Sequence, residues 1–144
     1  MDDKFQIQKE VSRYACEHFP TIIETLTGIE KLDQMTLGLE GWFRIELAKA
    51  IGQTDLLLKI RNKGADLKLK NNEYLELKAG ADLNFHYILK GIKNQPCLFL
   101  GKPRGRISDF DKEKIELEFK KRTNAYFEIK RLKYNWYIGL IYKI

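Results

Sequence analysis

The stretch Gly64-Ala65-Asp66-Leu67-Lys68-Leu69-Lys70-Asn71-Asn72-Glu73-Tyr74-Leu75-Glu76-Leu77-Lys78-Ala79-Gly80 decides the fold. Two runs in which apolar and charged residues alternate flank an Asn-rich turn, a pattern that predicts a β-hairpin with one buried face. The leucines form the apolar face, whereas Asp66, Glu76 and Lys78 belong to the charged residues of the other face. Two carboxylates and an amine gathered in this way predict a site for a hard divalent cation, because such ions prefer oxygen ligands.

The length of the turn decides whether the two carboxylates can meet. A two-residue turn at Asn71-Asn72 would place Asp66 and Glu76 on opposite faces of the hairpin. A three-residue loop over 71–73, or a bulge, would pair Asp66 with Lys78 and make the two carboxylates diagonal neighbours on one face. A metal site on this hairpin requires the second arrangement.

The composition fits one globular domain. The chain has 144 residues, of which 44% are hydrophobic, and no apolar run is long enough to cross a bilayer. The start of the chain lacks the pattern of a secretory signal, so a cytoplasmic protein without membrane contact is expected. Cys16 and Cys97 have no Cys or His at metal-ligand spacing, which favours two reduced thiols over a disulfide or a zinc site.

Charge is unevenly distributed along the chain. Residues 1–40 hold four basic and eight acidic residues, a net charge of −4, and because the whole chain carries +6 the remainder carries +10. A basic body that contains the hairpin indicates a polyanionic partner, although many proteins that bind no nucleic acid are also basic.

The hydrophobic periodicity predicts a fold of the α/β (α+β) class, a mixed β-sheet flanked by helices. A single domain, 1–144, would comprise an N-terminal helical extension (1–38), a core (39–100) and a C-terminal helix and hairpin (101–144). The predicted elements are a helix over 3–19 that ends at Pro20 with up to two further turns over 21–26, a helix over 39–52, a strand over 56–60, the hairpin, a helix over 82–93, a central strand over 97–100, a helix over 111–122, and a β-hairpin over 127–144. The alternation of apolar residues within 111–122 also fits a strand.

Glu46 is unusual because it lies within the apolar stripe of the predicted helix over 39–52. An ionised carboxylate on a core-facing stripe is costly unless it is paired or bound to a cation. Two interpretations remain open at this point. Glu46 either forms a salt bridge at the edge of the stripe, or it points toward the charged face of the hairpin.

Gly64-Ala65-Asp66-Leu67 and Glu76-Leu77-Lys78, with Glu46 on the preceding helix, resemble the PD-(D/E)xK nuclease superfamily, which has the restriction-endonuclease-like fold. The resemblance covers about residues 39–100. It implies that Asp66 and Glu76 bind Mg²⁺, for which Mn²⁺ can substitute, that Lys78 positions and deprotonates the attacking water, and that Glu46 assists the metal site. Ala65 replaces the Pro of the pattern, and the segment after Lys78 lacks the Gln-x-x-x-Tyr pattern of the RecB-like exonuclease branch.

A magnesium-dependent DNA endonuclease is therefore the expected activity, and cleavage of both strands would suit a homodimer. Basic residues near the expected strand ends are candidates for phosphate contacts: Lys59, Arg61, Lys63, Lys102, Arg104 and Arg106. Three alternatives remain open. The charges are a solvated strand face, the chain is a non-catalytic nucleic-acid-binding or assembly module with a nuclease-like fold, or its acidic N-terminal helix binds another protein.

Overall fold

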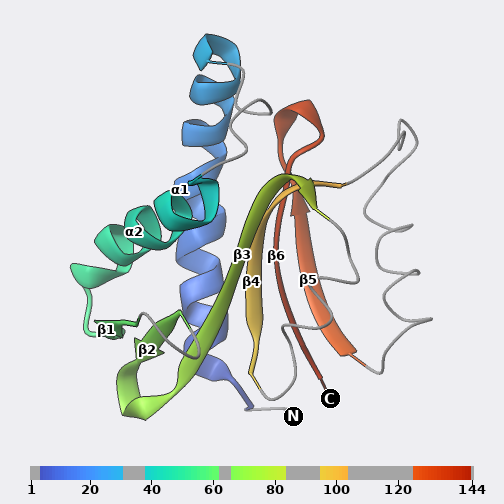
Figure 1. The fold of residues 1–144 in the computed structure, drawn as a ribbon. Coiled ribbons are helices and arrows are strands. Elements are labelled where there is room, and N and C mark those ends of the chain that lie inside the picture. Colours follow the sequence, from blue (N-terminus) through green and yellow to red (C-terminus); the bar gives the residue numbers. More distant parts are fainter. Residues whose placement is uncertain (1–3, 31–37, 62–65, 84–94, 104–124, 144) are drawn as a thin grey trace.

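The computed structural model describes residues 4–30, 38–61, 66–83, 95–103 and 125–143. Within these ranges the chain is a mixed α+β protein with two helices and a six-stranded mixed open sheet (Figure 1). The elements are α1 (Gln6–Glu30), α2 (Leu39–Gly52), β1 (Leu57–Ile60), β2 (Leu67–Leu69), β3 (Tyr74–Leu83), β4 (Cys97–Pro103), β5 (Ala125–Arg131) and β6 (Tyr137–Lys143).

The strands are arranged in the order β1-β2-β3-β4-β6-β5. Only β3 and β4 pair in parallel among the described strands, and the other neighbours are antiparallel. The predicted strand over 97–100 is confirmed, because β4 is hydrogen-bonded on both sides and its apolar residues are buried from Cys97 to Leu100. The predicted C-terminal hairpin is also confirmed by the antiparallel pair β5 and β6.

Both described helices pack on one face of the sheet. The strand residues that contact them alternate along each strand, as the period-2 geometry of a sheet requires. The buried cluster contains Val11, Ala15 and Phe19 from α1, Phe43, Leu47 and Ile51 from α2, and Leu75, Leu77, Leu98, Leu100, Ile138 and Leu140 from the sheet. Neither helix combines the length and apolar character that a membrane crossing requires.

Helix α1 does not end at Pro20, as the sequence predicted, but continues through it to Glu30. A proline inside a helix has no N–H to donate to the carbonyl four residues earlier, which here is that of Cys16. The Nζ atom of Lys130 on β5 donates a hydrogen bond to this carbonyl at 3.2 Å. A contact that is remote in the sequence thus replaces the missing helical bond.

Helix α2 has the predicted bounds, but Glu46 belongs to its partly exposed side. The buried residues are Leu39, Phe43, Leu47, Ala48 and Ile51. The predicted helix over 82–93 is wrong at its start, because β3 continues to Leu83. The rest of that helix and the predicted helix over 111–122 lie outside the described residues.

Gly139 on β6 provides the space that the ring of Phe99 on β4 occupies. The two residues are partners in the β4–β6 register, and a Cβ atom at Gly139 would lie 2.8 Å from Phe99 Cζ and 2.7 Å from the carbonyl oxygen of Glu128. Phe99 is in turn the partner of Lys78 on β3. Phe99 therefore connects the packing at Gly139 with strand β3, which carries the candidate site.

We expect Gly139→Ala to lower the free energy of unfolding by about 2 kcal/mol, because the added methyl group meets rigid backbone and a buried ring. Gly41→Ala is a matched control in helix α2, where no atom lies within 4 Å of the added Cβ. That substitution should instead stabilise the protein by about 0.5–1 kcal/mol. Urea unfolding of both variants measures the difference, and equal effects would contradict the described packing.

Candidate functional site

The turn between β2 and β3 has three residues, Lys70–Asn72, and differs from both arrangements considered from the sequence. The N–H of Leu69 donates to the carbonyl of Glu73 at 2.6 Å and closes the loop. Asn71 and Asn72 adopt φ values of 61° and 63°, in the left-handed region that Asn tolerates better than most residues.

The register that follows from this turn puts the two carboxylates on one face. Leu67 pairs with Leu75 and Lys68 with Tyr74, so that the next position places Asp66 opposite Glu76. The predicted pairing of Asp66 with Lys78 is therefore wrong. The requirement that the carboxylates share a face is met by a direct pair instead of a diagonal one.

The carboxylate of Asp66 lies where the backbone ladder between β2 and β3 ends. Its Oδ2 atom accepts a hydrogen bond from the N–H of Leu77 at 2.8 Å. Its Oδ1 atom lies 3.3 Å from Nη1 of Arg44 on α2, which also donates to the carbonyl of Arg61 at 3.4 Å. Asp66 thus joins β2, β3 and α2 at one point.

Glu76 and Lys78 project from β3 beside Asp66. A hydrogen bond connects the side chains of Glu76 and Asp66, and Lys78 Nζ lies 3.7 Å from Glu76 Oε1. Burial, more than any other cause, raises the pKa of Glu76 from 4.5 to about 7. The negative charge of Asp66 and the hydrogen bond to it act in the same direction, whereas Lys78 opposes the shift.

Helix α2 contributes Glu40 to this cluster and not the predicted Glu46. Burial raises the pKa of Glu40; Lys78 and Arg44 act against this shift and Asp66 acts with it. Glu46 instead lies 2.9 Å from Nε2 of His18 on α1. Of the two interpretations of Glu46 from the sequence, the paired position is the one observed.

Two residues of the cluster, Glu40 and Arg44, were missed by the sequence analysis. The signal was present, because residues four apart on a helix share a face, and this pair lies one turn apart at the start of α2. Glu46 lies about 240° around the helix axis from Glu40. The apolar stripe drew attention to Glu46, which contacts His18 of α1.

The donor set fits a cation that keeps part of its water shell. Asp66 and Glu76 provide adjacent carboxylate oxygens. Burial, and after it the negative charge of Asp66, raises the pKa of Glu76, and a positive ion nearby would favour its charged form. Within the described ranges, no group of three Asp, Glu, His or Cys side chains could hold a metal ion. Mg²⁺ commonly needs only one or two carboxylates, since water and substrate phosphates complete its coordination.

Cys97 does not add reactivity to the cluster, although it is the β4 partner of Glu76. Its side chain is fully buried, and this burial above all raises the pKa of the thiol well beyond its usual range. A thiol without access to solvent and without thiolate character is inert. The prediction of a reduced thiol at this position is confirmed.

Three of the six predicted phosphate-contacting residues are described, namely Lys59, Arg61 and Lys102; Lys63, Arg104 and Arg106 lie outside the described residues. Lys59 is exposed and directly opposite Lys68 in the β1–β2 register, which places two like charges together. The guanidinium carbon of Arg61 lies 5.1 Å from the ring centroid of Tyr74. Lys68 and Tyr74 are also partners, so these groups form a basic row on the carboxylate-bearing face.

Comparisons of this chain with models of protein families, with curated proteins and with solved structures found no match. The interpretation of the cluster therefore depends on its own geometry and chemistry.

The raised pKa of Glu76 predicts that stability falls as pH rises. The folded protein holds this proton up to about pH 7, whereas the unfolded chain releases it near pH 4.5, so stability is lost between these values. Glu76→Gln should remove this dependence and raise the free energy of unfolding at pH 8 by roughly 1–2 kcal/mol, allowing for partial solvent screening.

Urea unfolding of both proteins from pH 4 to 8 measures the effect. Glu10→Gln, at an exposed position of α1, is the control and should retain the dependence of the original protein. Parallel profiles for the original protein and Glu76→Gln would show that Glu76 is not perturbed.

Proposed function

We propose that the protein is a magnesium-dependent DNA endonuclease of the PD-(D/E)xK type, built on a restriction-endonuclease-like core. The observation that carries the proposal is the hydrogen-bonded carboxylate pair Asp66 and Glu76 on adjacent strands, with the Lys78 ammonium 3.7 Å from Glu76. Glu40 on the preceding helix interacts electrostatically with Lys78 and Asp66. Asp66, Glu76 and Lys78 are the residues on which the motif resemblance was based, whereas the helix carboxylate of this proposal is Glu40 and not Glu46.

Asp66 and Glu76 are the residues that would hold Mg²⁺. When bound, the ion would lower the pKa of a water molecule and neutralise charge on a phosphate oxygen. Glu40 would bind water in the outer coordination shell and keep that water oriented. These oxygen donors are appropriate for a hard cation.

The other residues of the cluster position the carboxylates and move a proton. Arg44 and the N–H of Leu77 occupy different oxygens of Asp66, so they fix the orientation of its carboxylate. Lys78 has only 13% of its side chain exposed and lies beside Glu76, where its ammonium can orient a water molecule against a phosphate. The partial burial of the pair also strengthens its electrostatic effect.

Plasmid cleavage in the presence of Mg²⁺ tests the proposal. We expect Asp66→Asn and Lys78→Met each to lower the cleavage rate by about 100-fold or more, because each removes a group that acts on the reacting atoms. Thermal unfolding should show that both variants remain folded. Cleavage at equal rates by the original protein and both variants, or by none of them, would exclude catalysis at this site.

The same assay distinguishes the two helix carboxylates. Glu40→Gln should lower the cleavage rate by about tenfold or more, since it removes a charge from the cluster. Glu46→Gln should leave the rate unchanged, because Glu46 contacts His18 of α1. The reverse result would mean that the sequence-based prediction of Glu46 was correct.

A second candidate function is nucleic-acid binding without catalysis. The specific observation in its favour is the basic row of Lys59, Lys68 and Arg61 over Tyr74. Two lysines directly opposite each other repel one another, and a bound phosphate would relieve this repulsion. Such a row would serve a nuclease equally well, so only the cleavage assay separates the two functions.

Lys59→Gln and Lys68→Gln should each weaken binding to duplex DNA and reduce the slope of log affinity against log salt by about 1. Each should also stabilise the protein by about 0.2–1 kcal/mol, because the like-charge pair is removed. Lys143→Gln, an exposed lysine at the end of β6, is the control for net charge. Fluorescence anisotropy over a salt series measures the binding, and identical slopes for all variants would remove the row from the DNA interface.

A further inference from the structure

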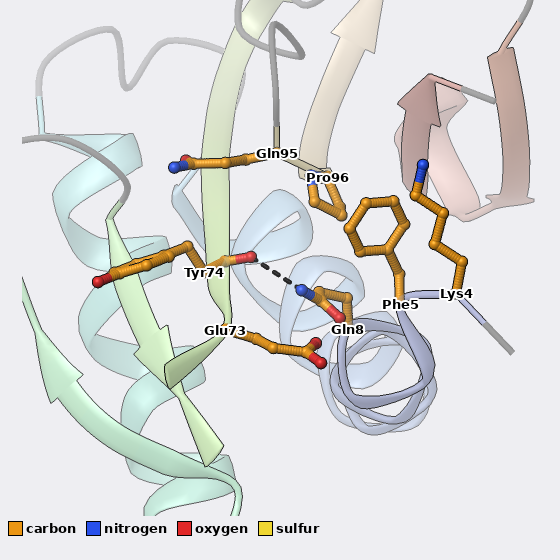
Figure 2. A pocket seen from close by; sticks show the side chains of 7 residues that line it. All are labelled: Lys4, Phe5, Gln8, Glu73, Tyr74, Gln95 and Pro96. Atoms are coloured by element: carbon orange, nitrogen blue, oxygen red, sulfur yellow. Dashed lines mark hydrogen bonds between the residues drawn. The ribbon is translucent and has the colours of Figure 1, made fainter. Parts of the chain in front are cut away.

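A cavity of about 410 Å³ lies between the first turn of α1, the start of β3 and the entry to β4 (Figure 2). None of its lining residues belongs to the carboxylate cluster. Its volume is within the range of small-molecule sites, and such sites combine apolar walls with a few polar groups. The residues that matter here are Lys4, Phe5, Gln8, Glu73, Tyr74 and Pro96.

Gln8 is almost completely buried, with 1% of its surface exposed. Its Nε2 atom donates a hydrogen bond to the carbonyl of Tyr74 at 3.0 Å (Figure 2). A carbonyl can only accept, so this bond fixes the orientation of the amide and leaves Oε1 as an acceptor. No group among the described residues donates to Oε1, and an unpaired buried acceptor costs about 1–3 kcal/mol.

Glu73 presents a second acceptor of the same kind. Its Oε2 atom is buried and has no hydrogen-bond partner within the described part of the chain. The side chains of Gln8 and Glu73 point toward each other in Figure 2, while that of Lys4 extends away from both. An amide oxygen and a carboxylate oxygen are both acceptors, so a donor to either must come from a ligand or from water.

Phe5 forms one wall of the cavity in a strained backbone conformation. Its φ of 61° is rare for a bulky residue and costs on the order of 1–3 kcal/mol. Edge-on contact with the ring of Tyr142, at a centroid distance of 4.9 Å, holds the Phe5 ring in place. The wall is therefore fixed before any ligand arrives, and Pro96 adds a second flat apolar surface.

We propose that this cavity binds a guanidinium group, either of a free small molecule or of an arginine side chain on a partner protein. A guanidinium carries several N–H donors in one plane, and these can reach two acceptors at once. Its faces are weakly hydrated and pack well against flat apolar and aromatic groups. The charge of Glu73 adds a charge-assisted hydrogen bond, which is about twice as strong as a neutral one.

Titration of the full ¹⁵N-labelled chain with methylguanidinium, followed by NMR, tests the proposal. We expect saturable chemical-shift changes at Phe5, Gln8 and Glu73, with a Kd on the order of 1 mM. The uncharged methylurea should bind at least about tenfold more weakly. A capped Gly-Arg-Gly peptide that binds more tightly than methylguanidinium would support a protein partner, and weaker binding would support a free small molecule. No saturable shift with either guanidinium probe would show that water alone fills the cavity and would overturn the proposal.

Glu73→Gln provides an independent check, because its amide can donate to Gln8 Oε1. We expect this variant to gain a few degrees in Tm and to lose about tenfold or more in affinity for methylguanidinium. Glu10→Gln, with the same charge change at an exposed position of α1, should retain both properties of the original protein. Unchanged affinity of Glu73→Gln would overturn the proposal, and neither result involves the cleavage activity.

Discussion

The bond between the Asp66 carboxylate and the N–H of Leu77 is the interaction on which the candidate site depends. It lies at the end of the described antiparallel ladder between β2 and β3, and it satisfies the backbone N–H of Leu77. A side chain that replaces backbone in a sheet is held more firmly than one that only projects from it. Arg44 occupies the other oxygen of Asp66, so helix α2 is fixed to the same point.

The partly buried charges of this cluster lower the stability of the fold. Burial raises the pKa values of Glu76 and Glu40, and the charge of Asp66 adds to both shifts, which means that the fold opposes their ionisation. Selection for stability alone would replace at least one of them with a neutral residue. Several like charges in one partly buried place are typical of sites in which a cation or an anionic substrate compensates them.

Local patterns in the sequence were sufficient for part of the fold. The bounds of α2, the buried strand β4 and the hairpin of β5 and β6 follow from periodicity and from Gly and Pro positions. The exact turn between β2 and β3 did not, because two left-handed Asn residues permit a loop that simple hairpin rules do not favour. A similar three-residue loop at Lys133–Asn135 has Tyr134 at φ 62°. A left-handed residue in such a loop is therefore not limited to Asn.

Other features depend on contacts that are remote in the sequence. Pro20 taken alone indicates a helix end. The helix continues because Lys130, on a strand more than a hundred residues later, donates a hydrogen bond to the Cys16 carbonyl. The sequence does not tell which of Glu40 and Glu46 lies near the carboxylates of the hairpin. This depends on how α2 is rotated about its own axis against the sheet. Propensity describes the local chain, whereas the environment of a charge is a tertiary property.

Strand β3 connects the carboxylate cluster with the cavity that Gln8 and Glu73 line. The carbonyl of Tyr74 accepts a hydrogen bond from Gln8. Two residues later, the N–H of Glu76 donates a hydrogen bond to the carbonyl of Pro96 at 2.9 Å. Pro96 also lines the cavity, so one bond joins its wall to the backbone of a proposed metal ligand. The two sites have separate chemistry, but they share the rigid strand that positions them.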